Sequence, residues 1–177
     1  MRLFIALGIP KRISEKLFEA EADLPTRGPR GVSYSDMHIT LKFLGEVSEG
    51  GAVEWIKSRL SKIRFSRFVA RVRGVGTFPQ GNCPRVVWAG VEGAPLNALA
   101  KKVEGALSER FPTDGKAFSA HISLARADGR INVQSFLDKH RGEEFGEFEV
   151  GELLLIRSVL GPEGTKYSAI ARFPAEE

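Results

Sequence analysis

The sequence predicts a single α+β domain spanning residues 1–177, with two similar lobes whose mainly antiparallel sheets face each other across a central cleft and whose helices lie outside. Three observations predict it. The 177 residues suit one globular domain, with 42% hydrophobic and 27% charged residues. Strand-like alternation and helical spacing follow each other along the chain. The tetrapeptide His-Ile-Thr-Leu at 38–41 returns as His-Ile-Ser-Leu at 121–124, which indicates two related lobes.

The first lobe is predicted to contain three strands and two helices. The opening residues alternate up to Pro10, and Ile13, Leu17 and Ala20 then recur at helical spacing before a break at Leu24. A basic stretch rich in Pro and Gly has the composition of a loop. The pattern predicts strand, helix, loop, strand, helix and strand at residues 2–9, 13–20, 25–31, 38–45, 48–63 and 65–77.

The second lobe is predicted to repeat this order and to add a hairpin. The Gly-Pro-Glu-Gly sequence at 161–164 is typical of the turn between its two last strands. The pattern predicts strand, helix, strand, short helix, strand and strand at residues 85–92, 96–111, 118–126, 133–140, 145–160 and 166–173.

Composition narrows the class of protein without naming its function. The net charge of +4 and pI near 9.4 favour attraction of a polyanion but do not require one. The lone Cys83 has no partner for a disulfide within the chain, and the short apolar start lacks a secretory cleavage region. We therefore expect a cytoplasmic protein without a membrane anchor. Asn and Gln are scarce beside Arg, Lys and Glu, a balance reported for heat-adapted proteins.

The repeated tetrapeptides carry the candidate chemistry. Because side chains alternate along a strand, His38, Thr40 and Lys42 are predicted to share one face, and His121 is predicted to share a face with Ser123. Two imidazoles without a further nucleophile suit phosphodiester cleavage, in which one removes a proton and the other protonates the leaving oxygen. The two hydroxyls would then donate hydrogen bonds to the nonbridging phosphate oxygens.

A single histidine on a strand is more often structural or solvated than catalytic. Here two of the three histidines occupy matching frames, which packing alone gives no reason to expect. His140 lies between Lys139 and Arg141 in a polar helix end and is predicted to be solvated.

Nearly the whole sequence resembles the two-histidine phosphoesterases, in particular the RNA 2′,3′-cyclic phosphodiesterases that are also called 2′-5′ RNA ligases. Each His-x-Thr/Ser motif is unspecific alone, but both in this order form a strong signal. The resemblance rests on the opening 2–6, the two histidine signatures 38–45 and 121–126, and the segments 76–79 and 85–88.

The resemblance implies the bilobal LigT-like fold and hydrolysis of a 2′,3′-cyclic phosphate to a 2′-phosphate. From the residues themselves we expect no metal or other cofactor. The resemblance implies that His38 is the general acid and His121 the general base. It also implies that Arg126 contacts phosphate, although a regular strand would turn this residue away from His121, so the strand must end or bulge near Ala125. Lys42 would add positive charge or remain a solvated lysine. The expected partner is RNA with a cyclic phosphate end, such as a tRNA fragment, or a small cyclic nucleotide, acted on by a monomer.

Other features are less specific. A basic stretch could follow an RNA backbone or be a solvated sheet edge, and three aromatic residues could stack on bases or fill the core. Neither a metal-binding spacing nor an NTP-binding loop occurs in the sequence. The basic residues are Lys62, Arg64, Arg67, Arg71 and Arg73, and the aromatic residues are Tyr34, Phe78 and Trp88.

Three alternatives stay open. The same site could join a cyclic end to a 5′-hydroxyl and form a 2′-5′ linkage, which is the reverse reaction. It could act on a small cyclic nucleotide instead of RNA. The cleft could also hold a nucleotide or RNA end for a partner without catalysis.

Overall fold

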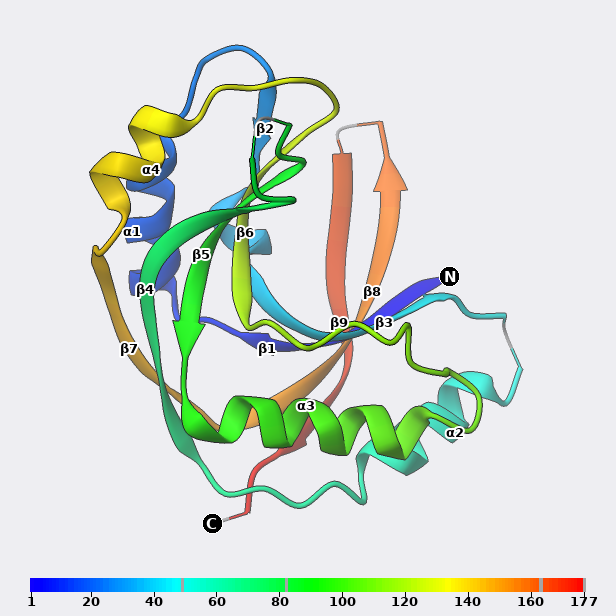
Figure 1. The fold of residues 1–177 in the computed structure, drawn as a ribbon. Coiled ribbons are helices and arrows are strands. Elements are labelled where there is room, and N and C mark those ends of the chain that lie inside the picture. Colours follow the sequence, from blue (N-terminus) through cyan, green and yellow to red (C-terminus); the bar gives the residue numbers. More distant parts are fainter. Residues whose placement is uncertain (49, 82, 163, 177) are drawn as a thin grey trace.

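The computed structural model describes residues 1–48, 50–81, 83–162 and 164–176. These residues form an α+β fold, as predicted (Figure 1). A short 3-10 helix at Tyr34–Asp36 precedes β3. The strands are β1 (Arg2–Gly8), β2 (Pro29–Gly31), β3 (His38–Glu46), β4 (Phe68–Phe78), β5 (Val86–Glu92), β6 (His121–Ala127), β7 (Glu144–Val150), β8 (Glu152–Gly161) and β9 (Gly164–Pro174). The helices are α1 (Lys11–Glu21), α2 (Ala52–Leu60), α3 (Ala94–Leu107) and α4 (Gln134–His140).

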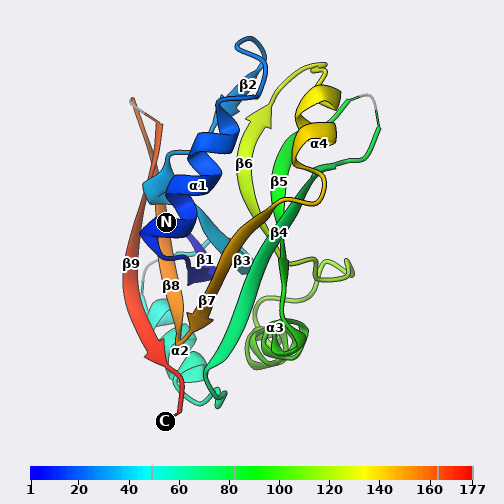
Figure 2. The same ribbon diagram turned by 90° about the vertical axis from the view of Figure 1, so that its left-hand side faces the viewer.

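The strands form one continuous sheet with two wings. Their order is β7-β4-β5-β6-β3-β1-β8-β9, and β2 pairs with β6 off this path. The named strands pair antiparallel, and the wings join where Ile39 of β3 lies opposite Ile122 of β6. From this junction β8 and β9 diverge from β4, β5 and β6, as two perpendicular views show (Figures 1 and 2). The two predicted sheets are thus the wings of one curled sheet.

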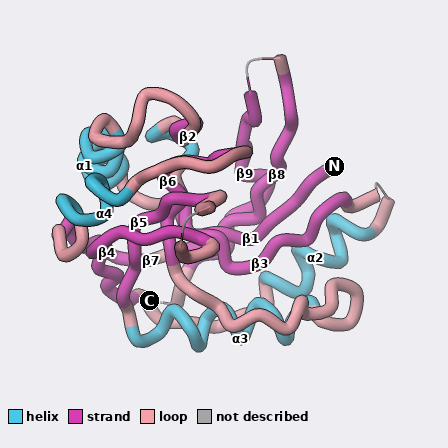
Figure 3. Tube along the Cα trace, turned by 45° about the horizontal axis from the view of Figure 1, so that its top comes forward, coloured by secondary structure: helices cyan, strands magenta, loops and turns pink. Residues whose placement is uncertain are grey.

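The helices lie outside the wings. Helices α1 and α4 lie together beside the wing of β4, β5, β6 and β7, whereas α2 and α3 lie together at the other end of the molecule (Figure 3). Helix α1 therefore follows a strand of one wing and packs against the other. This crossing adds contacts between the two wings.

The wings are not the two halves of the chain, which corrects the sequence interpretation. Strand β4, predicted as part of the first lobe, pairs with β5 and β7 of the second wing, and β8 and β9 return to β1. The strand predicted at 145–160 is two strands that separate at Gly151 and enter different wings. Continuous β-propensity does not reveal such a change of partner, because pairing depends on which sheet edges are free. Helix α2 begins later than predicted, and Glu49 and Glu163 of the predicted helix and turn lie outside the described residues.

Strand β1 is buried on both faces and separates two apolar clusters. Leu3, Ile5 and Leu7 belong to the main core, while Phe4 and Ala6 pack with Leu154, Ile156 and Tyr167 in a small cluster on the other face. The small cluster lies behind His38, because the Phe4 ring is 4.8 Å from its imidazole, centroid to centroid. One side of the His38 ring therefore packs against the side chains of this cluster.

Strand β2 is a feature that the sequence did not predict, since three residues within a loop carry no periodicity. It lies close to the end of α1, where a Cβ atom on Gly31 would be 1.6 Å from Oε1 of Glu21. Burial raises the pKa of Glu21 to about 7. The absence of a side chain at residue 31 thus leaves room for the Glu21 carboxylate between α1 and β2.

His140 is buried, so the prediction of a solvated histidine is wrong. Its Nε2 atom lies 2.8 Å from Oδ2 of Asp23, its Nδ1 atom contacts Glu143, and its ring lies against Phe136. Lys139 also pairs with Asp23, and the bonds from Lys139 and His140 lower the pKa of that carboxyl. Lys139 and His140 thus connect α4 to the turn after α1, whereas Arg141 pairs with Asp138 of α4 itself.

We expect His140→Ala to reduce the free energy of unfolding by about 2 kcal/mol, because it removes a buried ring and leaves two carboxylates without their shared partner. Urea denaturation should show a lower midpoint. Lys139→Ala removes only an exposed ion pair and should change the midpoint little. Equal midpoints for His140→Ala and the unchanged protein would show that this contact does not stabilise the fold.

Candidate active site

Both motif histidines line one pocket of about 190 Å³ at the junction of the two wings. The other predicted site residues are Thr40, Ser123, Arg126 and Lys42, and the first three line it as well. The lining residues are Val32, Asp36, His38, Thr40, Phe43, Val86, His121, Ser123, Arg126 and Tyr167. The pocket therefore brings together side chains from both copies of the repeated motif.

An extra residue in β3 decides which side chains reach the pocket from the first motif. Strand β1 pairs Ile5 with Lys42 and Ala6 with Thr40, so two neighbouring residues of β1 lie opposite three of β3. This β-bulge at Leu41 reverses the alternation of side chains that follows it. Phe43, five residues after His38, therefore faces the pocket.

Lys42 faces away from the pocket, so its predicted position beside His38 and Thr40 is wrong. It is only 8% exposed, and its Nζ atom lies 2.7 Å from Oε1 of Glu104 on α3. The strict alternation assumed from the sequence fails at Leu41 because of the bulge. Lys42 thus connects β3 to α3, and we do not assign it to the substrate.

Strand β6 carries the same irregularity after the second histidine. Val87 pairs with Ala125 and Trp88 with Ser123, so Leu124 is the extra residue of this bulge. Arg126, five residues after His121, consequently turns to the pocket face. This is the bulge near Ala125 that the resemblance required.

The two imidazoles are oriented in the same way. Nδ1 of His38 lies 2.6 Å from the carbonyl oxygen of Asp36, and Nδ1 of His121 lies 2.7 Å from that of Ser119. A carbonyl oxygen only accepts hydrogen bonds, so each Nδ1 carries the proton and donates it. Nε2 of each ring is then the nitrogen available to a substrate, as an acceptor when the ring is neutral and as a donor when it is protonated.

Aromatic rings pack against both histidines. Tyr167 lies edge-on to His38 with centroids 5.3 Å apart, and Phe78 lies edge-on to His121 at 4.9 Å. Burial lowers the pKa of both histidines below the ordinary imidazole value, although the hydrogen bonds to the backbone carbonyls raise it in part. The positive charge of Arg126 lowers both pKa values further.

Arg126 supplies positive charge to the pocket. Within the described ranges, no hydrogen bond or ion pair engages its guanidinium group. It lines the same pocket as both imidazoles, and its charge acts on both of them. Two imidazoles, two hydroxyls and a guanidinium around one pocket can bind a phosphate group and transfer protons on either side of it.

The sequence did not identify Phe43, Tyr167, Asp36, Val32 and Val86 as pocket residues. Phe43 is 68% exposed, which is unusual for a phenylalanine, but only the bulge brings it to this face. Tyr167 comes from the last hairpin, far from both motifs in the sequence. No sequence signal marks these positions, since their approach depends on how β3, β5 and β9 are placed around the junction.

The three aromatic residues considered for base stacking do not line the pocket. Phe78 packs between His121 and Trp88, and Tyr34 packs edge-on against Phe18 on α1. Base stacking by these rings stays a prediction.

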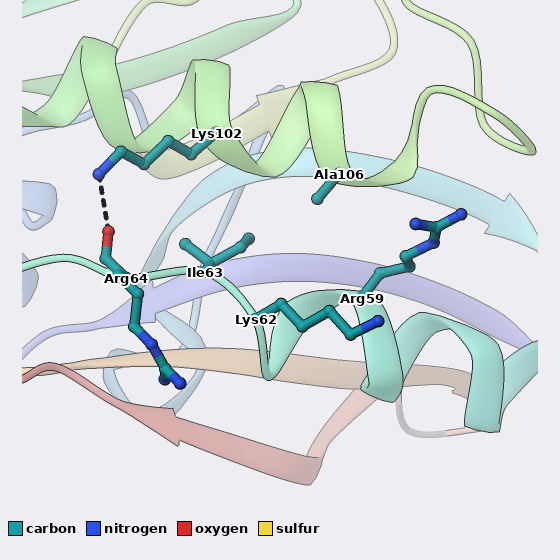
Figure 4. Close-up of a pocket in the computed structure, with 6 residues that line it drawn as sticks. All are labelled: Arg59, Lys62, Ile63, Arg64, Lys102 and Ala106. Atoms are coloured by element: carbon teal, nitrogen blue, oxygen red, sulfur yellow. Dashed lines mark hydrogen bonds between the residues drawn. The ribbon is translucent and has the colours of Figure 1, made fainter.

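A second hollow of about 400 Å³ lies between α2 and α3 (Figure 4). Arg59, Lys62, Arg64 and Lys102 surround it, and Lys102 donates to the carbonyl oxygen of Arg64 at 2.7 Å. Although larger, it is lined by no histidine or carboxylate among the described residues, so it offers no group suited to proton transfer near neutral pH. We therefore locate the candidate active site in the smaller pocket.

Two residues of the predicted basic stretch, Arg71 and Arg73, lie on β4, which has neighbours on both sides and is not a sheet edge. The other three lie between α2 and β4. Arg67 and Arg71 lie 3.0 Å and 3.4 Å from glutamates of β7, and Arg64 lies 3.5 Å from Glu176. Three of the five basic residues thus form exposed ion pairs within the protein. Binding of RNA along it stays a prediction.

Among the described residues, no group of three His, Cys, Asp or Glu side chains is arranged to hold a metal ion. The helices they form include none with the length and hydrophobicity needed to cross a membrane.

Comparison with known proteins places the chain in a family. Residues 7–88 match the family described as LigT like phosphoesterase. The chain is 37% identical over 176 residues to an RNA 2′,3′-cyclic phosphodiesterase of Archaeoglobus fulgidus, covering 98% of this chain and 99% of the relative. It is 35% identical to an enzyme of the same name from Aquifex aeolicus, covering 98% and 96%.

Solved structures agree with this similarity. A protein of Thermus thermophilus superposes with a TM-score of 0.85 at 32% identity over 100% of both chains. Escherichia coli LigT, solved in complex with 3′-AMP, superposes with a TM-score of 0.84 at 26% identity over 99% of this chain and 98% of LigT. With relatives matched from end to end and the same fold, the chain belongs to the LigT-like phosphoesterases.

Proposed function

We propose that this chain opens the 2′,3′-cyclic phosphate at an RNA end to a 2′-phosphate, with His38 and His121 as a general acid and base and without a metal ion. The observation that carries the mechanism is the convergence of both imidazoles on one pocket, each with Nδ1 bound to a backbone carbonyl. The general activity, RNA 2′,3′-cyclic phosphodiesterase, is that of relatives 35% and 37% identical over nearly the full chain. The chain is accordingly a hydrolase of this kind.

In the proposed reaction Nε2 of His121 accepts a proton from a water molecule while the water oxygen attacks phosphorus. The bond from phosphorus to the 3′-oxygen breaks, and Nε2 of protonated His38 delivers a proton to that oxygen. The products are a 2′-phosphate and a 3′-hydroxyl, and proton exchange with solvent restores both rings. A positioned acid or base contributes roughly 10² to 10⁴ in rate. The family resemblance supports the assignment of acid and base, which the near symmetry of the two motifs leaves open.

The remaining polar groups would stabilise the phosphate as negative charge develops on its nonbridging oxygens. Thr40 and Ser123 each lie two residues after a histidine on the same strand face, so their hydroxyls can donate to these oxygens. Arg126 adds a guanidinium group that can form two parallel hydrogen bonds to phosphate. Phe43 and Tyr167 provide apolar surface beside this phosphate site for the attached nucleoside.

The RNA substrate is proposed from the relatives' names, and the nucleotide bound to Escherichia coli LigT supports recognition of a nucleotide end by this fold. Use of tRNA fragments, a monomeric state and a cytoplasmic location stay predictions.

Replacing either motif histidine with alanine should lower kcat by about 10² to 10⁴. Phosphorus NMR of a 2′,3′-cyclic-ended RNA, incubated with the protein and a chelator, should show a 2′-monophosphate only when both histidines are present. His140→Ala, assayed at a temperature where it remains folded, is the matched control and should retain activity. A 3′-monophosphate would reverse the choice of leaving oxygen, and loss of activity with chelator would refute metal independence.

The pH profile of kcat/KM should be centred below the ordinary imidazole pKa of about 6.5. The base must be neutral and the acid protonated, so the lowered pKa values of both histidines move both limbs of the profile to lower pH. Arg126→Met removes a charge that lowers both pKa values and should shift both limbs to higher pH, besides reducing kcat/KM. Arg126→Lys keeps the charge and should keep the position of the profile. Limbs that stay in place in Arg126→Met would contradict this electrostatic role.

A further inference from the structure

We propose that Arg30 binds the phosphodiester immediately 5′ of the terminal nucleotide, and that it thereby makes the site favour RNA over a mononucleotide. This inference rests on the proposed function and extends the same site by one nucleotide. It concerns a residue of β2, an element that the sequence did not predict.

The position of Arg30 follows from the pairing of β2 with β6. Arg30 lies directly opposite Arg126, and Val86 of β5 lies opposite Arg126 on the other side. Residues opposite each other in an antiparallel pair project from the same face of the sheet. Since Arg126 and Val86 line the pocket, Arg30 projects from the pocket face as well.

Val32 supports the same orientation independently. Its backbone N–H donates to the carbonyl oxygen of Leu124 at 2.7 Å, which continues the pairing beyond Gly31, and its side chain lines the pocket. Arg30 precedes Val32 by two residues, so alternation along an extended chain places both on one face. Two separate relations therefore direct Arg30 toward the rim of the pocket.

The placement also defines a direction along β6. Strand β3 meets β6 at Ile122, next to His121, and β2 meets the same strand from Ala125 to Ala127. A phosphate between the histidines would lie near the first of these pairings, and Arg30 lies at the second. Arg126 lies at the second pairing too, opposite Arg30 and on the same face, so this end of β6 carries two positive charges.

The charge of Arg30 is held in place but remains accessible. Its guanidinium lies 2.6 Å from Oδ2 of Asp128, and the two side chains are 72% and 82% exposed. Arg85 donates to the backbone carbonyl of Asp128 at 2.6 Å, which fixes the segment that carries this carboxylate. An ion pair this exposed is weak, whereas an arginine can bind phosphate through two parallel hydrogen bonds. An RNA phosphate can therefore engage Arg30 without first breaking a strong interaction.

The geometry suits two successive phosphates. Neighbouring strands lie about 4.8 Å apart, so the two arginines project from neighbouring positions on one face. Like charges directly opposite each other on a sheet destabilise it, and a bound polyanion would relieve this repulsion. A mononucleoside cyclic phosphate brings only the phosphate that reacts, whereas an RNA end also brings the preceding phosphodiester. Only the longer substrate can use Arg30.

The test compares kcat/KM for three substrates with a 2′,3′-cyclic end. They are a mononucleoside, a dinucleotide with a normal internal phosphodiester, and the same dinucleotide with an uncharged methylphosphonate linkage. Arg30→Met should lower kcat/KM about tenfold on the normal dinucleotide, as expected for one lost charge-assisted contact, and should stay within about twofold on the mononucleoside. Arg30→Lys should recover part of the loss, because it keeps the charge but not the planar group.

The methylphosphonate substrate tests whether Arg30 and the internal phosphate act on each other, because it removes the charge of the phosphate. The unchanged protein should process it about tenfold less well than the normal dinucleotide, and Arg30→Met should cause no further loss, because the two partners act as a pair. Arg141→Met is the matched control: Arg141 is also an exposed arginine, 76% accessible, paired with an aspartate, but it follows α4. It should leave all three substrates unaffected.

The outcomes separate this inference from the proposed function. If the unchanged protein opens none of the three substrates, the proposed function fails and the inference with it. If the protein is active and Arg30→Met lowers activity equally on all three, or on none, only the inference fails. Further loss on the methylphosphonate substrate in Arg30→Met would also overturn it, since Arg30 would then act on something other than the internal phosphate.

Discussion

The pairing of β3 with β6 at Ile39 and Ile122 holds the pocket together, because it joins the two wings of the sheet next to both histidines. Each paired isoleucine is buried and directly follows a histidine, so the alternation that directs the isoleucines into the core directs both imidazoles to the other face. The apolar residue in each motif therefore anchors the strand, and the polar residues before and after it face the pocket. Packing and placement of the candidate catalytic groups depend on the same few residues.

The extra residue in each motif strand adds a second constraint. With regular strands, Lys42 would face the pocket, and Arg126 would face the core. The bulges at Leu41 and Leu124 reverse this arrangement, so that a lysine is buried in an ion pair and an arginine is presented to the pocket. Both bulges occur at equivalent places in the two motifs, which extends the internal symmetry from the tetrapeptides to the backbone. Where the first motif places Phe43 in the pocket, the second places Arg126. Equivalent backbone positions in the two motifs therefore hold different side chains, an apolar ring from β3 and a positive charge from β6.

The surroundings of the histidines connect the fold to the chemistry. The Phe4 cluster on one face of β1 packs against His38, and the aromatic pair of Phe78 and Trp88 packs against His121. Burial lowers the pKa of each imidazole, while the carbonyl at its Nδ1 holds the ring and partly restores its basicity. Strand β2 closes the remaining side beside Arg126. A side chain at position 31 would require the Glu21 carboxylate to move from its present place.

The sequence by itself determined the α+β class, most of the elements and the pair of histidines with their hydroxyls. These features are encoded locally, in periodicities of two or about 3.6 residues and in a repeated tetrapeptide. The tertiary structure decided the exchange of β4, β8 and β9 between the wings, the burial of His140 and the direction of Lys42. It also decided that Phe43, Tyr167 and β2 reach the pocket. Strand partners and bulges depend on contacts between segments that are distant in the sequence. A local pattern therefore does not predict which strand of the sheet a given strand will pair with.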